Sequence, residues 1–235
     1  MNTLRLNEKK GIPVPNKNGS TNFGAIAMDG KRLFALKTSQ SNKISTLFSY
    51  QDFRTGCSYK TRKYTNQMGH GNGMCYWEGK LYIAPLDKYI QVIDEKNGMK
   101  RTKLTTPINI NSIAHYRGNL FLAGLNLIRI TGRTVELVKK LKLSWEDPSF
   151  PIGQDIGFHK GRLYIIRSSS EKNQNLIIRC PFDGKVGTLS PDRIYVSEKH
   201  KDLYEFESID FLSNTMVIAA NVVSDKDGIF TAKDA

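Results

Sequence analysis

The side chains best suited to chemistry are oxygen-bearing residues that stand just ahead of short apolar segments. They are Asn72, Asn111, Asp155 and Glu207, with His70 two residues ahead of Asn72. Carboxylate and amide oxygens are the ligands that a hard cation such as Ca²⁺ prefers. The same groups form hydrogen bonds with sugar hydroxyls. These residue types therefore fit a divalent-cation site with Glu207, Asp155, Asn72 and Asn111 as ligands, a sugar-binding site, or a polar opening that holds only water.

The segments that position these residues are copies of one repeat. Five stretches align, at 23–36, 72–85, 111–124, 154–167 and 207–220. In each copy the second residue is small or polar, a turn that contains Gly or, in the last copy, Asn214 follows, and a run of β-forming, mainly apolar residues comes next. Gly and Asn tolerate the positive φ of a hairpin turn. Each copy is therefore predicted to be a β-hairpin.

The spacing of the copies predicts the fold. The turn residues at 30, 79, 118, 161 and 214 are separated by 49, 39, 43 and 53 residues. This is the period of a β-propeller blade of four antiparallel strands. We predict an all-β, single-domain, five-bladed β-propeller, with blades at about 22–66, 70–106, 109–143, 152–197 and 205–235. The last blade lacks a strand, and we expect N-terminal residues 2–7, through Thr3-Leu4-Arg5-Leu6, to complete it and close the ring.

Two sets of aligned residues begin the innermost strands. One set is Gly24, Gly73, Ser112, Asp155 and Ser208, and the other, one position earlier, is Phe23, Asn72, Asn111, Gln154 and Glu207. Side chains alternate along a strand, so only one set can point into the central channel. Both sets can reach the rim of the channel. The channel mouth is therefore the predicted site.

Other residues carry less chemistry. Trp145 lies in a loop that leads into the fourth blade, and it is predicted either to stack on a sugar or to pin the loop. The sequence has no GxSxG motif of a serine hydrolase. Its three cysteines, Cys57, Cys75 and Cys180, include no CxxC pair, which argues against a disulfide framework or a zinc site. Nucleophilic catalysis is therefore not favoured.

The charge of the chain indicates the kind of partner. The formal net charge is +13, and such a field attracts anionic molecules. The basic residues form no long run and no single-strand stacking motif is present, so nucleic acid is not the favoured partner. The sequence contains neither a transmembrane-length apolar stretch nor an apolar segment of signal-peptide length near Met1. We expect a cytoplasmic protein, or one exported without a visible signal peptide.

Two families share features with these repeats. The stretches GHGNGMCYWEGKLYIA (69–84) and ESIDFLSNTMVIAA (207–220) resemble small β-propellers of Firmicutes, the helveticin J-like and cell-envelope or phage-associated proteins. This resemblance implies a binding role at the cell envelope. The residues Glu207, Asn72, Asn111 and Asp155 are also similar to the ligand set of gluconolactonase and senescence-marker propellers. That second resemblance implies a divalent cation that polarises a lactone or ester.

Three functions follow as hypotheses. The leading one is a non-catalytic propeller that binds a glycan or an anionic surface polymer at the channel mouth, near His70, Asn72, Asn111, Asp155 and Glu207. The second is a hydrolase or lactonase that depends on Ca²⁺ or another divalent cation. The third is a scaffold that binds a partner protein on an exposed face.

Overall fold

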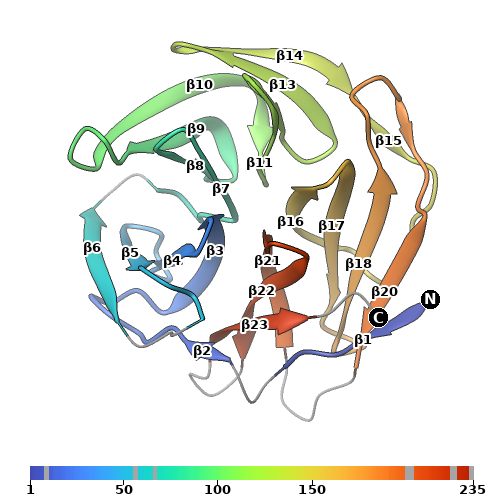
Figure 1. Cartoon of the computed structure of the whole chain (residues 1–235), viewed down its shortest axis with the longest axis horizontal. Helices are drawn as coiled ribbons and strands as arrows, with labels where there is room; N and C mark the ends of the chain where they lie inside the picture. Colours follow the sequence, from blue (N-terminus) through green and yellow to red (C-terminus); the bar gives the residue numbers. More distant parts are fainter. Residues whose placement is uncertain (8–10, 55–57, 66–67, 199–203, 223–226, 233–235) are drawn as a thin grey trace.

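The protein is a ring of antiparallel sheets around one axis, as seen in a computed structural model (Figure 1). The structure describes residues 1–7, 11–54, 58–65, 68–198, 204–222 and 227–232. Five sheets form the ring, each with four antiparallel strands and one of them extended by a fifth strand, which confirms the predicted five-bladed β-propeller. No segment within these described ranges is a helix that could span a membrane.

Each blade is an antiparallel sheet whose first strand lies nearest the axis. Blade one contains β3 (Asn22–Asp29), β4 (Arg32–Thr38), β5 (Ile44–Tyr50) and β6 (Tyr59–Thr65). Blade two contains β7 (Gly73–Trp77), β8 (Lys80–Ala84), β9 (Asp87–Asp94) and β10 (Lys100–Ile110). Blade three contains β11 (Ala114–Arg117), β12 (Leu120–Leu122), β13 (Asn126–Thr131) and β14 (Thr134–Lys140).

The last two blades draw on both ends of the chain. Blade four contains β16 (Ile152–His159), β17 (Arg162–Ser169), β18 (Gln174–Pro181) and β20 (Arg193–Ser197), with β1 (Asn2–Leu4) added at its edge. Blade five contains β21 (Tyr204–Leu212), β22 (Thr215–Val222), β23 (Gly228–Ala232) and β2 (Ile12–Pro13). A short parallel pair joins β15 (Lys142–Leu143) to β19 (Thr188–Leu189). We call the face where β3, β7, β11, β16 and β21 begin the upper face, and the face where they end the lower face.

The hairpin between the first two strands of each blade has the expected backbone. Gly79 has a φ of 83° and Gly161 a φ of 75°, in the left-handed region that favours glycine. In the last copy the positive φ is at Ser213, at 56°, and not at the predicted Asn214. The predicted end of blade one at residue 66, the predicted end of blade five at residue 235 and the side chain of Cys57 lie outside the described residues. Cys75 and Cys180 are free, buried thiols.

Aromatic side chains at the lower ends of the innermost strands join neighbouring blades. Trp77 of blade two stacks on His115 of blade three, with ring centroids 4.9 Å apart. His159 of blade four stacks on Phe211 of blade five at 4.5 Å. Such pairs add to the free energy gained by burying their apolar area. The two histidines, which lie three residues before Gly118 and two residues before Gly161, thus have a packing role.

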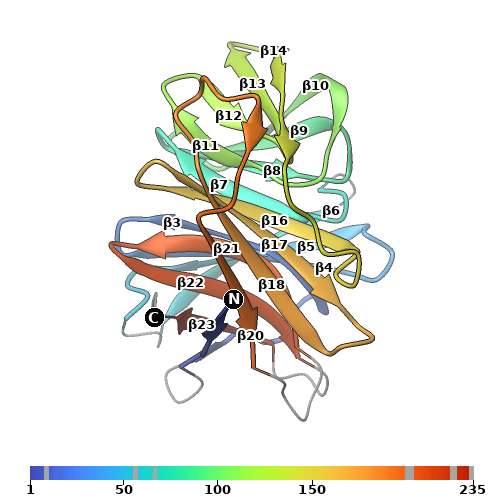
Figure 2. The same cartoon turned by 90° about the vertical axis from the view of Figure 1, so that its right-hand side faces the viewer.

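The ring is closed by the N-terminal segment, but not by the predicted residues. β2 (Ile12–Pro13) pairs with β23 and supplies the missing strand of blade five. Residues Asn2–Leu4 instead form β1, which pairs in parallel with β20 of blade four (Figure 2). Leu6 makes one isolated bridge, with Ala232. The assignment of the closing strand to Thr3-Leu4-Arg5-Leu6 was therefore wrong, because the first residues cover the open edge of blade four before the chain reaches blade five.

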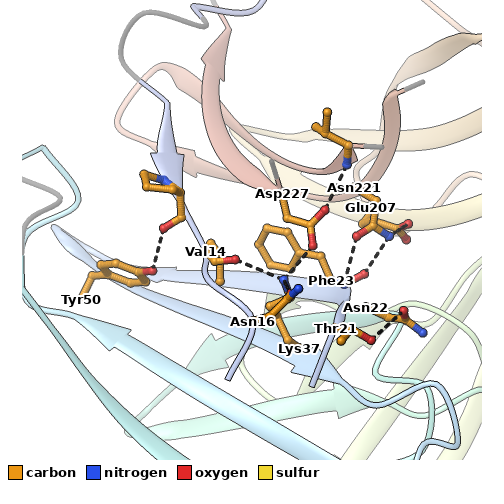
Figure 3. Close-up of polar contacts among 12 residues, drawn as sticks. Val14, Asn16, Thr21, Asn22, Phe23, Lys37, Tyr50, Glu207, Asn221 and Asp227 are labelled. Carbon is orange, nitrogen blue, oxygen red and sulfur yellow. Dashed lines mark hydrogen bonds and ion pairs between the residues drawn. The ribbon is translucent and has the colours of Figure 1, made fainter. Parts of the chain in front are cut away.

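A buried ion pair holds this closure together (Figure 3). Lys37 of β4 is 1% exposed, and its Nζ lies 2.7 Å from Oδ2 of Asp227, just before β23. The same ammonium donates to Asn16 Oδ1 at 2.6 Å and to the Val14 carbonyl at 3.1 Å. Lys37 therefore ties blade one, blade five and the N-terminal segment to one point. We call Lys37, Asp227, Val14 and Asn16 the closing cluster.

Removing the carboxylate of the closing cluster should destabilise the ring strongly. Asp227→Ala leaves a buried ammonium without its counter-charge, and we expect a loss of about 3–5 kcal/mol in unfolding free energy. The control is Glu136→Ala, which breaks the exposed Arg129–Glu136 pair and should cost less than about 1 kcal/mol. Chemical denaturation measures both. Equal losses for the two variants would contradict the role of this pair.

Candidate functional site

The innermost strands meet at the upper end of the axis. A Cβ atom on Gly73 of blade two would lie 2.3 Å from Asp155 Oδ1 of blade four and 2.9 Å from the Cα of Ser112. Blades two and four are not neighbours in the ring, so this contact crosses the axis. A Cβ on Gly24 would likewise lie 2.3 Å from the carbonyl oxygen of Gly71. Of the two predicted sets, the one with Gly24, Gly73, Ser112, Asp155 and Ser208 therefore faces the axis.

Asp155 is the polar centre of this meeting point. It is fully buried, and Ser208 donates its hydroxyl to Asp155 Oδ2. The Ser208 oxygen accepts the backbone N–H of Ile26 at 3.1 Å, so the contact continues into blade one. Within the described part of the chain Asp155 Oδ1 has no hydrogen-bond partner. Burial raises the pKa of Asp155 well above its usual value, because the apolar surroundings favour the uncharged form of the carboxyl.

Irregularities in strand pairing affect where side chains point near the start of β16 and β21. The register shifts between Gly153 and Ile156 and between Phe206 and Ser208. Such bulges insert an extra residue and redirect side chains. Glu207 falls in the second bulge and accepts a hydrogen bond from Asn221 Nδ2 of the same blade (Figure 3). Burial, and next the charge of Glu205, raise the pKa of Glu207 well above its usual value.

The predicted residues of blades two and three lie together. Asn72 is buried, and its Nδ2 donates to the backbone carbonyl of Asn111 at 2.9 Å. Asn111 itself is exposed at the upper face. His70 is half-buried, and its backbone N–H donates to the Pro85 carbonyl at 3.2 Å. Asn72 thus fixes the backbone that presents the Asn111 side chain.

A cleft opens on the upper face beside the axis. Its volume is about 480 Å³, and residues of blades two, three and four line it. Its polar lining consists mainly of amides and one guanidinium, from Asn109, Asn111, Asn126, Gln154 and Arg167. Apolar lining comes from Leu86, which is 49% exposed, and from Leu125. We call this the upper cleft.

Sequence reasoning found only part of the upper cleft. It selected Asn111 and noted Gln154, but it missed Asn109, Asn126 and Arg167. Arg167 closes the fourth repeat copy, where its charge departs from the apolar or small residues that end the other copies. That departure is the signal that could have identified it. Asn109 and Asn126 lie outside the aligned repeat copies. A polar residue at such a position is common and does not indicate a binding site.

Trp145 is positioned by packing. It is half-buried against the apolar cluster shared by blades three and four, which includes the buried Phe150. This contact agrees with the predicted role of pinning its loop. A role in stacking on a sugar stays a prediction.

The predicted metal ligands occupy different surroundings. Asp155 lies at the axis, Glu207 pairs with Asn221, and Asn72 donates to Asn111. The described residues contain no group of three or more His, Cys, Asp or Glu side chains that could hold a metal ion. The raised pKa values of both carboxyls favour their neutral forms, which bind cations poorly. The divalent-cation site stays a prediction.

A second cavity of about 160 Å³ lies at the lower end of the axis, lined in part by Cys75, His115 and Asp210. Burial raises the pKa of Cys75 well above its usual value, so its thiol is protonated and unsuited to nucleophilic attack. Asp210 accepts backbone N–H groups of Met28 at 2.7 Å and Phe211 at 2.8 Å. Burial nevertheless raises the pKa of Asp210 to about 6. This acid therefore ionises between blades five and one as the pH rises to neutrality.

Asp210 should make the ring less stable as the pH rises. Because its pKa is raised from 3.8 to about 6 in the folded protein, the stability it contributes is complete below 3.8 and is lost as the pH passes about 6. Relative to Asp210→Asn, the wild-type protein should lose on the order of 2–3 kcal/mol of unfolding free energy between about pH 3.5 and 7. Denaturant unfolding of both proteins across this range measures the difference. Parallel pH profiles would rule out the raised pKa.

The fold of the chain, but not its sequence, matches known proteins. No protein family and no curated protein matches the sequence. The crystal structure of Myxococcus xanthus glutaminyl cyclase matches with a TM-score of 0.61 and 11% identity, over 93% of this chain and 92% of that one. The computationally designed Ika4 protein gives a TM-score of 0.40 and 10% identity, over 73% and 98% of the two chains, and YCF48 bound to D1 peptide gives 0.45 and 11%, over 89% and 69%. The first match supports a β-propeller, a fold compatible with binding or scaffold roles.

Proposed function

We propose that the chain is a non-catalytic binding propeller that recognises an acidic glycan in the upper cleft. The observation that carries this proposal is the lining of the cleft, in which amide side chains and one guanidinium surround a volume of about 480 Å³. Ligand sites in proteins are concave and combine apolar walls with a few polar groups. The upper cleft has both.

The amides suit sugar hydroxyls. Each amide offers a carbonyl acceptor and an NH₂ donor, so it can meet a hydroxyl in either role. Asn109 and Asn111 are both exposed. Asn109 lies near the end of β10, Asn111 directly follows that strand, and Asn126 begins β13. Gln154 is held from behind, because its Nε2 donates to Glu205 at 2.7 Å. A glycan lying in the cleft would thus meet amides on both sides.

Arg167 supplies the preference for an acidic sugar. Its guanidinium lies over Gly153, where a Cβ would be 3.2 Å from Nη1, so the glycine leaves room for it. Nη2 lies 3.6 Å from Glu146, whose side chain is 65% exposed, and such an exposed pair is weak. A ligand carboxylate or sulfate can replace it with bidentate hydrogen bonds. The net charge of +13 favours the approach of such a ligand.

Other hypotheses have less support from the contacts of the chain. A metal-dependent hydrolase or lactonase requires ionised ligands, whereas Asp155 and Glu207 both have raised pKa values. A protein-interaction scaffold is compatible with the fold, but no contact among the described residues identifies one face of the ring as its docking surface. The finer relationship to helveticin J-like or gluconolactonase-type propellers, and with it a place at the cell envelope, rests on the sequence resemblances alone.

Two substitutions test the proposal by calorimetry and on an array of acidic and neutral oligosaccharides. Arg167→Gln should weaken binding of an acidic oligosaccharide by about tenfold, because a charge-assisted hydrogen bond is lost. Asn111→Ala should weaken the binding of acidic and of neutral oligosaccharides alike, by about fivefold. Only Arg167→Gln should reduce the preference for acidic over neutral ligands.

Two matched controls lie in blade three, toward its lower end. Asn119→Ala removes an exposed amide at the other end of β11, and Arg129→Gln removes an exposed guanidinium from β13. Both controls should bind like the wild-type protein. The absence of binding to every oligosaccharide, or binding that Arg167→Gln and Asn111→Ala leave unchanged, would refute the proposal.

A further inference from the structure

A separate pocket lies on the lower face between blades four and five. Its volume is about 260 Å³. It shares no lining residue with the upper cleft. The residues that carry the argument are His159, Lys160, Arg162, Arg179, Phe211 and Asn214. We call this the lower pocket.

Three cationic side chains converge on the lower pocket. Lys160 occupies the turn between β16 and β17, Arg162 begins β17, and Arg179 lies on β18. One carboxylate offsets them in part, since Asp192 accepts from Arg162 Nε at 3.2 Å and from Arg179 Nε at 2.8 Å. The pocket therefore keeps a net positive charge after its internal ion pairs are counted.

These cations are held in place before any ligand arrives. Asp192 fixes Arg179 through both of its oxygens, at 2.8 and 3.2 Å, and holds Arg162 on the same carboxylate. Lys160 Nζ donates to Asn214 Oδ1 across the boundary between the two blades. Long cationic side chains usually lose conformational entropy on binding, so this arrangement reduces that cost. Preorganised cations of this kind are typical of anion sites.

The wall of the pocket adds an aromatic surface and an unused polar atom. The His159 ring stacks on Phe211 at 4.5 Å with an interplanar angle of 9°. His159 Nε2 is buried and has no hydrogen-bond partner among the residues that the structure describes. A buried polar atom without a partner is costly unless a bound group satisfies it. Burial lowers the pKa of His159, so the neutral ring can offer Nε2–H as a donor.

We propose that the lower pocket binds a phosphate or sulfate group carried by a small molecule. Lys160 would contact the oxyanion from a turn, Arg162 and Arg179 would contact it from two strands, and His159 Nε2 would donate to a further oxygen. A tetrahedral group offers oxygens in several directions, which suits donors that come from a turn and two strands. A carboxylate offers only two oxygens and fits this set less well.

The test measures binding of inorganic phosphate and sulfate to the full chain by calorimetry and by thermal shift, at constant ionic strength. We expect a dissociation constant of about 1 mM or below for at least one of the two ions. Arg162→Gln and Lys160→Gln should each weaken that binding by about tenfold. His159→Phe keeps the stack on Phe211 but removes Nε2, and it should weaken binding by about fivefold.

Arg129→Gln is the matched control. The Arg129 and Arg162 side chains are both 44% exposed, and each pairs with one carboxylate, but Arg129 lies in blade three. This control should bind phosphate and sulfate like the wild-type protein. Three results would overturn the proposal. They are a dissociation constant above about 10 mM for both ions, acetate that binds as tightly as both ions, or an equal loss of affinity in Arg162→Gln and Arg129→Gln.

Discussion

The close approach of the innermost strands at the axis governs the rest of the molecule. Gly73 of blade two lies so near to Asp155 of blade four that a single added carbon would fall 2.3 Å from the carboxyl oxygen. Small residues at the aligned positions let blades that are not neighbours touch each other. Ser208 then links Asp155 to Ile26, so the contact extends around the ring. Five blades enclose little space at this level, and the side chains fill it.

This constraint determines where a ligand can bind. Because the axis is filled around Asp155, the upper cleft lies to one side, between the starts of blades three and four and beside Leu86 of blade two. The Asp155 carboxyl at the axis is buried, its pKa is raised by that burial, and it acts as a structural group within the ring. Lys37 and Asp227 close the same ring at the boundary of blades one and five. Because the axis is filled and the closure is fixed, a ligand can bind only at the loops and at the boundaries between blades.

The repeat spacing was sufficient to predict the fold, because each copy carries its own turn and its own apolar strand. It also predicted that the set with Gly73 and Asp155, or the set with Asn72 and Glu207, would face the axis, but not which. The bulge at Glu207 depends on pairing with β22 and has no signature in one strand. The closing strand was misplaced because Thr3–Leu6 and Ile12–Pro13 are both short segments, and only the free edge of β20 decides between them. Arg167 was missed because its position near the end of a strand does not show that residues of blades two and three form a cleft beside it.

The most direct measurement compares Gly73→Ala with Gly187→Ala by denaturant unfolding. A Cβ on Gly187 would meet no atom within 4 Å, so that variant should change the unfolding free energy by less than about 0.5 kcal/mol. Gly73→Ala places a carbon against Asp155 and the backbone of Ser112, and overpacking of this kind costs about 1–3 kcal/mol. A clear loss confined to Gly73→Ala is the expected result. If the two variants unfold alike, the strands do not meet at the axis as described.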